Sequence, residues 1–128
     1  MPQFDAIGVI ASDMAETLAF YRLLGLDIPA GADGEDHVEV EIAEGFRMMF
    51  DTIEVVERFT TYEPPAGGRG VGFAFRCESA AQVDGIFADV VAAGYAVREE
   101  PFDAFWGQRY ATVLDPDGNP VDLYAPLG

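Results

Sequence analysis

The chain has 128 residues, of which half are hydrophobic and 12% aromatic, a composition that predicts one folded domain and argues against disorder. It carries 23 acidic residues against 7 basic ones, for a net charge of −16. Such a balance disfavours binding to nucleic acid and to anionic ligands, and it would concentrate cationic ligands at the surface. The alternative is that the acidity serves solubility alone.

The expected location is the cytoplasm. No apolar run approaches the roughly 18 residues that a membrane span needs, so no membrane association is expected. The N-terminal stretch lacks the basic flank of a signal peptide, because the first arginine is Arg22. The single cysteine, Cys77, cannot form an intrachain disulfide and suits a reducing compartment.

The first half opens with an apolar strand over residues 4–11, followed by a helix with clear end signals. Asp13 and Glu16 have the spacing of a capping box, and Gly25 stands where the helix should stop. The apolar stripe of this helix comprises Met14, Leu18, Tyr21 and Leu24. Two strands are expected next, over residues 37–42 and 47–50; the first alternates apolar and polar side chains.

The second half repeats this plan. A strand over residues 71–77 precedes a helix that begins at a second capping box, Ser79 and Gln82, and ends at Gly94. The apolar positions of this helix are Val83, Ile86, Phe87, Val90 and Val91. Strands are expected over residues 96–100, 110–114 and 121–125, and the "DPDGNP" between the last two predicts a hairpin turn. Each half is therefore β-α-β-β with a further short strand expected, giving two copies of one α+β module.

The segments "SDMAETLAFYRLLGLDI" and "WGQRYATVLDPDGNPVDLYAP" resemble the vicinal oxygen chelate superfamily, which includes glyoxalase I, extradiol dioxygenases and bleomycin-resistance proteins. The resemblance covers essentially the whole chain. It implies an α+β fold of two βαβββ modules that form a curled mixed-sheet cup with helices on the convex side, in a molecule that commonly forms homodimers. The single domain of residues 1–128 would comprise a first module at about 1–62, a linker at 63–70 and a second module at about 71–128.

The resemblance also locates the metal ligands of the metal-using members, and they are nearly absent here. The corresponding positions are Ala6, Gly72, about Met48, and Asp122. Alanine and glycine have no donor atom, and a thioether suits Zn²⁺, Fe²⁺ or Ni²⁺ poorly, so one carboxylate remains where a catalytic metal needs about three ligands. We therefore expect no cofactor. An alternative metal site would combine His37 with Glu39 and Glu41, which share one face of a strand.

The resemblance then points to the metal-free antibiotic-binding members. A "WG" followed by a basic and an aromatic residue is similar to their drug-binding segment, and Trp106 offers a stacking surface. The alternative is that Trp106 fills the junction between the modules. Asp122 would pair with a ligand cation, or with Arg76 or Arg109 inside the protein. The candidate ligand-binding residues are Trp106, Asp122, Tyr110, Tyr124, Arg76, Phe50, Glu39 and Glu41.

These expectations favour a metal-independent, bleomycin-resistance-like protein that sequesters a small aromatic or cationic compound and carries no catalytic residues. The alternative is a glyoxalase-type metal-dependent lyase, isomerase or dioxygenase with a relocated metal site. A third possibility is an accessory domain whose cup is filled by its own side chains. The identity of the ligand does not follow from a fold that many functions share.

Overall fold

The computed structural model describes residues 1–64 and 72–128 of the chain. The chain divides into two compact units, Met1–Pro64 and Pro65–Gly128. Most of the predicted linker and the predicted strand start at Val71 lie outside the described residues.

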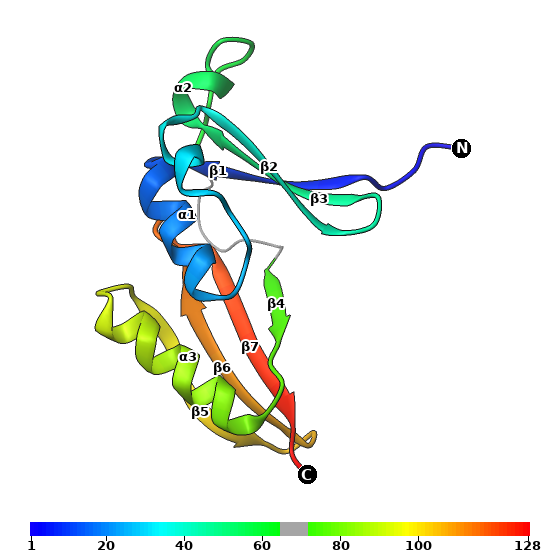
Figure 1. Cartoon of the computed structure of the whole chain (residues 1–128), viewed down its shortest axis with the longest axis vertical. Coiled ribbons are helices and arrows are strands. Elements are labelled where there is room, and N and C mark those ends of the chain that lie inside the picture. Colours follow the sequence, from blue (N-terminus) through cyan, green and yellow to red (C-terminus); the bar gives the residue numbers. More distant parts are fainter. Residues whose placement is uncertain (65–71) are drawn as a thin grey trace. The chain divides into compact units, whose positions relative to one another are not determined.

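The first unit contains a three-stranded sheet in the order β1-β3-β2 (Figure 1). Strand β1 is parallel to β3, and β2 is antiparallel to β3. The elements in chain order are β1 (Ala6–Ala11), α1 (Met14–Leu23), the 3-10 helix η1 (Ala30–Gly34), β2 (His37–Ala43), β3 (Phe46–Thr52) and α2 (Ile53–Val56).

Helix α1 begins and ends as its sequence predicts. The Asp13 side chain accepts a hydrogen bond from the Glu16 amide at 3.1 Å. At the other end Gly25 has φ +101°, which lets the Leu26 amide donate to the Tyr21 carbonyl and closes the last turn. The predicted apolar stripe is buried at all four positions, Met14, Leu18, Tyr21 and Leu24.

The second unit contains a four-stranded sheet in the order β4-β7-β6-β5, with α3 lying along one side of β5, β6 and β7 (Figure 1). Strand β4 is parallel to β7, and the remaining pairs are antiparallel. The elements are β4 (Phe73–Arg76), α3 (Ala80–Ala92), β5 (Val97–Ala104), β6 (Gln108–Leu114) and β7 (Pro120–Pro126).

Helix α3 uses a variant of the predicted capping box. Ser79 accepts from the Gln82 amide at 3.1 Å, while the Gln82 side chain accepts from the amide of Glu78 rather than that of Ser79. Val83 and Val90 are fully buried, but Val91 is 49% exposed, so its assignment to the apolar stripe is wrong. Val91 follows Val90 by one residue, which rotates it about 100° away from the core-facing line.

The predicted α+β fold of two related modules is confirmed. The second unit is a complete βαβββ module, whereas the described part of the first has three strands. The joining of the two sheets into one cup stays a prediction.

In the first unit the segment after α1 contains η1, and the Arg22 guanidinium binds this segment. It donates to the carbonyls of Ile28 at 2.8 Å and Pro29 at 2.7 Å, and it pairs with the carboxylate of Asp33 at 2.8 Å.

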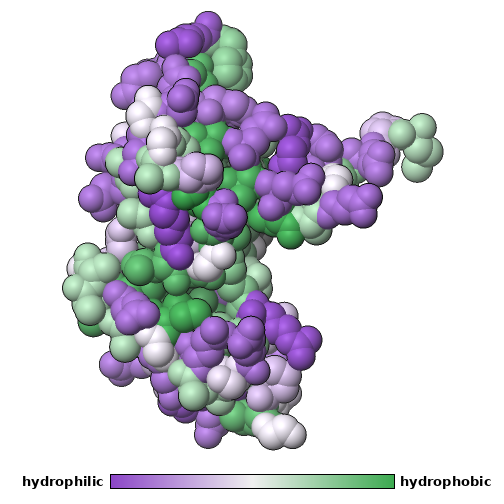
Figure 2. Space-filling view, in the orientation of Figure 1, coloured by the Kyte–Doolittle hydropathy of each residue, from purple (hydrophilic) through white to green (hydrophobic). Residues whose placement is uncertain are grey.

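Hydrophilic side chains cover much of the surface shown in Figure 2, in line with the strongly acidic composition. Within the described residues, no helix combines the length and apolar character that crossing a bilayer requires.

Candidate functional site

In the second unit, α3 covers one side of the sheet. No helix among the described residues of that unit covers the other side, which is called here the helix-free face. Arg109 of β6 reaches Asp84 of α3 at 2.9 Å, which places odd-numbered residues of β6 on the helix side. Tyr110 and Thr112 therefore lie on the helix-free face. Strand register adds the residues paired with them on β7 and β4, which are Tyr124, Asp122, Arg76 and Ala74.

Asp122 lies near the centre of this face and is held by two hydroxyl groups. Thr112 Oγ1 donates to its Oδ1 at 2.8 Å, and the Tyr110 hydroxyl donates to its Oδ2. The alternative pairing with Arg109 is wrong, because Arg109 pairs with Asp84 and Asp103. Among the described residues, Asp122 forms no ion pair with Arg76 either. Because an ionised carboxylate has about four acceptor positions, Asp122 keeps capacity for a further donor.

Tyr110 links Asp122 to a group of aromatic rings. Burial, and then the hydrogen bond to the Asp122 carboxylate, raises the pKa of Tyr110 to about 12. The phenol therefore stays protonated at neutral pH and remains the donor to Asp122. Its ring centroid lies 5.3 Å from that of Trp106 at an interplanar angle of 80°, an edge-to-face contact.

The aromatic group is carried by the β5–β6 hairpin. Phe102 contacts both Trp106 and Tyr110 edge-to-face, and Phe105 contacts Trp106 with centroids 5.0 Å apart. Gly107 has φ +90°, and its backbone N–H closes the turn by donating a hydrogen bond to the Ala104 carbonyl. Trp106 is 49% exposed, and its Nε1 donates to Gln108 Oε1 at 2.8 Å, so the indole is oriented while half its surface remains accessible.

The sheet of the first unit likewise has a side that packs against a helix, α1, and a helix-free face of its own. Val38 and Val40 of β2 and Met48 and Phe50 of β3 are buried on the α1 side. Phe50 is fully buried, with its ring 5.4 Å from that of Tyr21, so its assignment to a ligand-binding wall is wrong. Glu39 and Glu41 lie on the helix-free face, opposite Met49 and Arg47 respectively.

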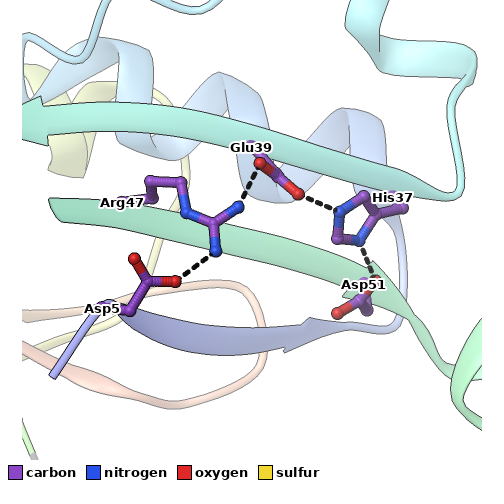
Figure 3. Close-up of polar contacts among 5 residues, drawn as sticks. All are labelled: Asp5, His37, Glu39, Arg47 and Asp51. Atoms are coloured by element: carbon purple, nitrogen blue, oxygen red, sulfur yellow. Dashed lines mark hydrogen bonds and ion pairs between the residues drawn. The ribbon is translucent and has the colours of Figure 1, made fainter. Parts of the chain in front are cut away.

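A chain of alternating charges crosses that face (Figure 3). His37 Nδ1 lies 2.5 Å from Asp51 Oδ1, and His37 Nε2 lies 2.9 Å from Glu39 Oε2. Arg47 continues the chain from Glu39 to Asp5, whose Oδ2 is 2.5 Å from Arg47 Nη2. Both imidazole nitrogens can donate only in the protonated ring. The hydrogen bonds to Glu39 and then to Asp51 accordingly raise the pKa of His37.

This arrangement predicts a pH-dependent contribution of His37 to stability. A raised folded-state pKa stabilises the fold fully below the unfolded value of about 6.5, and the contribution is lost as pH rises through the folded value. Because the side chain is 42% exposed, the contribution should stay below about 1 kcal/mol. Urea unfolding of the wild type and His37→Gln should show the wild-type advantage shrinking between about pH 6 and pH 9. A constant difference across that range would contradict the charged pairing.

The sequence interpretation missed several partners that complete these faces. Asp51, Thr112, Gln108 and Phe102 all contact predicted residues. The sequence of β3 did indicate which of its sides is polar. Arg47, Met49 and Asp51 are two residues apart and so share one face of the strand, which the two charged residues mark as the polar side. Cys77 is buried, and burial raises the pKa of its thiol.

Comparison with known proteins agrees with this architecture. Residues 3–123 match the family model of the Glyoxalase/Bleomycin resistance protein/Dioxygenase superfamily. The chain belongs to this superfamily. A comparison with curated proteins found no match.

Solved structures of superfamily members and related proteins share the fold. An Agrobacterium tumefaciens protein solved by NMR is 28% identical with a TM-score of 0.70, and the match covers all of both chains. A glyoxalase/bleomycin resistance protein from Albidiferax ferrireducens is 25% identical with a TM-score of 0.68, covering 95% of this chain and 97% of that one. A glyoxalase/bleomycin resistance protein/dioxygenase family enzyme from Burkholderia phytofirmans is 17% identical with a TM-score of 0.77, covering 98% and 100%.

The donor chemistry of this superfamily member does not fit the metal chelate that the resemblance describes. Met48 points to α1 rather than to the helix-free face, which corrects its assignment. Its neighbours on that face, Arg47 and Met49, offer a guanidinium with no acceptor and a soft thioether. Ala6 and Gly72 add no donor atom.

The alternative metal patch of His37, Glu39 and Glu41 is not assembled either. His37 contacts Glu39 and Asp51 through opposite sides of its ring, and Glu41 lies opposite Arg47 in the strand register. In the part of the chain that the structure describes, no three His, Cys, Asp or Glu side chains are grouped so as to hold a metal ion.

Proposed function

We propose that this superfamily member binds a small aromatic or cationic compound, without a metal, on the helix-free face of its second sheet. The observation that carries the proposal is the continuous path from the half-exposed Trp106 ring through Tyr110 to the Asp122 carboxylate. An aromatic face attracts a cation through its quadrupole, and a carboxylate with free acceptor positions attracts the same charge. The net charge of −16 raises the local concentration of such ligands.

Bleomycin, an aromatic cationic compound, is the probe for a first test. Titration with metal-free bleomycin should quench the fluorescence of Trp106, the single tryptophan, in a saturable manner. Asp122→Asn should weaken binding about tenfold or more, because a hydrogen bond to a charged group is worth about 1.5–3 kcal/mol. Because Trp106→Ala has lost the fluorophore, its affinity for bleomycin is measured by calorimetry instead.

Asp84→Asn is the matched control. It removes the same charge from the α3 side of the sheet and should leave bleomycin affinity within about twofold of the wild type. A flat titration would contradict the proposal. Equal weakening by Asp84→Asn would show general charge attraction in place of a site. One equivalent of transition metal bound to purified protein would overturn metal independence and favour the lyase, isomerase or dioxygenase alternative.

The proposal includes a cytoplasmic homodimer. The support for the cytoplasm is the single buried thiol of Cys77, which suits a reducing compartment. The support for the dimer is the resemblance to superfamily members that pair. Light scattering on the samples used for titration would report the oligomeric state.

A further inference from the structure

Among the described arginines, Arg76 differs from most in forming no ion pair with a described acidic side chain. The sequence has 23 acidic residues and 7 basic ones, so arginines are readily neutralised. Within residues 1–64 and 72–128, ion pairs occupy Arg22, Arg47, Arg58 and Arg109. Arg76 and Arg98 form none of these pairs. Arg98 is followed directly by Glu99 and Glu100 in the irregular part of β5, whereas Arg76 lies on the helix-free face that carries Asp122.

The register places Arg76 close to Asp122 without joining the two charges. Arg76 pairs with Tyr124, and Ala74 pairs with Asp122, on the adjacent parallel strands β4 and β7. A strand spacing of about 4.8 Å and a two-residue rise of about 6.6 Å put the Cα atoms of Arg76 and Asp122 about 8 Å apart. The carboxylate is turned to Tyr110 and Thr112, so the two opposite charges remain separate on one face with Tyr124 beside them.

We infer that the ligand is an aromatic zwitterion, whose cationic group meets Asp122 and whose carboxylate meets Arg76. This inference rests on the proposed function for its cationic half and adds the anionic half. The guanidinium presents a planar pair of donors that matches a carboxylate. On a surface with a net charge of −16 an anionic group is otherwise repelled. An exposed arginine that forms no ion pair with the described carboxylates gives such a group a favourable position.

The test compares three probes built on one benzene ring. The zwitterion is 4-(aminomethyl)benzoate, with its charges at opposite ends of the ring. The cation is benzylamine, and the anion is benzoate. Calorimetric titration of the full chain should show 4-(aminomethyl)benzoate binding about fivefold tighter than benzylamine, the size expected for an exposed ion pair. Benzoate should bind most weakly. In Arg76→Gln the affinity ratio of zwitterion to amine should fall to about one or below.

Arg98→Gln is the matched control, because it removes the same charge from β5, which lies two strands from β7 and Asp122, whereas β4 with Arg76 is adjacent to β7. It should keep the wild-type ratio. A wild-type ratio of one or less, an unchanged ratio in Arg76→Gln, or binding of none of the three probes would overturn the inference. The bleomycin titration decides the proposed function separately. Saturable bleomycin binding together with a ratio of one would leave that function standing and remove the zwitterion.

Discussion

Phe50→Ala should lower the free energy of unfolding by about 3–5 kcal/mol, the usual cost of truncating a buried phenylalanine. The Phe50 ring is fully buried and packs against Tyr21 of α1 with centroids 5.4 Å apart. Its removal leaves a cavity between the sheet and the helix of the first unit, which well-packed neighbours fill only in part. Urea unfolding followed by circular dichroism measures the loss.

Met49→Ala is the control from the same strand. Met49 is only partly buried and lies on the helix-free face, so its truncation should cost less than about 1.5 kcal/mol. Phe50→Leu, which removes less volume, keeps the comparison measurable if Phe50→Ala does not fold. A cost for Phe50→Ala below that for Met49→Ala would mean that the two faces of β3 are assigned the wrong way round.

The error over Phe50 shows how a strand's phase can be lost in an apolar run. Residues 48–50 are all apolar, so the run itself does not say whether Met49 or its two neighbours face the helix. The flanking Arg47 and Asp51 carry the distinction, since residues two apart share a face. The burial of Met48 and Phe50 against α1 agrees with that flanking pattern.

Local chemistry predicted the ends of the helices and the last turn. Asp13 and Ser79 cap their helices, Gly25 and Gly94 end them with positive φ, and Gly118 takes φ +83° in the β6–β7 turn. Each of these features depends on a few consecutive residues, so sequence alone suffices to find it.

The partners of Asp122 depend on strand register and were not predicted. Thr112 comes opposite Asp122, and Tyr110 opposite Tyr124, only because of how β6 and β7 align. The sequence suggested an ion pair between Asp122 and Arg76 or Arg109 because the charges are opposite. Arg109, however, points to the opposite side of the sheet and reaches α3. Charge complementarity identifies candidate partners, whereas the side on which each residue lies selects among them.

The second large effect is expected at Asp115, which organises the turn that sets this register. The residue is 3% exposed. Its carboxylate accepts from the backbone amides of Asp117 at 3.0 Å and Asn119 at 2.8 Å, and from Asn119 Nδ2 at 2.8 Å. Asp115→Ala would leave these donors without their acceptor in a partly buried turn. Because each unsatisfied group costs about 1–3 kcal/mol, we expect a loss of about 3 kcal/mol in the free energy of unfolding, measured in urea.

Asp115→Asn should recover part of that loss, because its amide oxygen can still accept from the two backbone amides while its NH₂ opposes that of Asn119. A turn loosened in this way should also weaken bleomycin binding. The Leu114–Pro120 pair lies next to the turn and begins the register that aligns Tyr110 and Thr112 with β7. A folded Asp115→Asn variant with wild-type affinity would show that β6 and β7 keep their register without the turn. Wild-type stability in Asp115→Ala would show that the three hydrogen bonds contribute nothing to the fold.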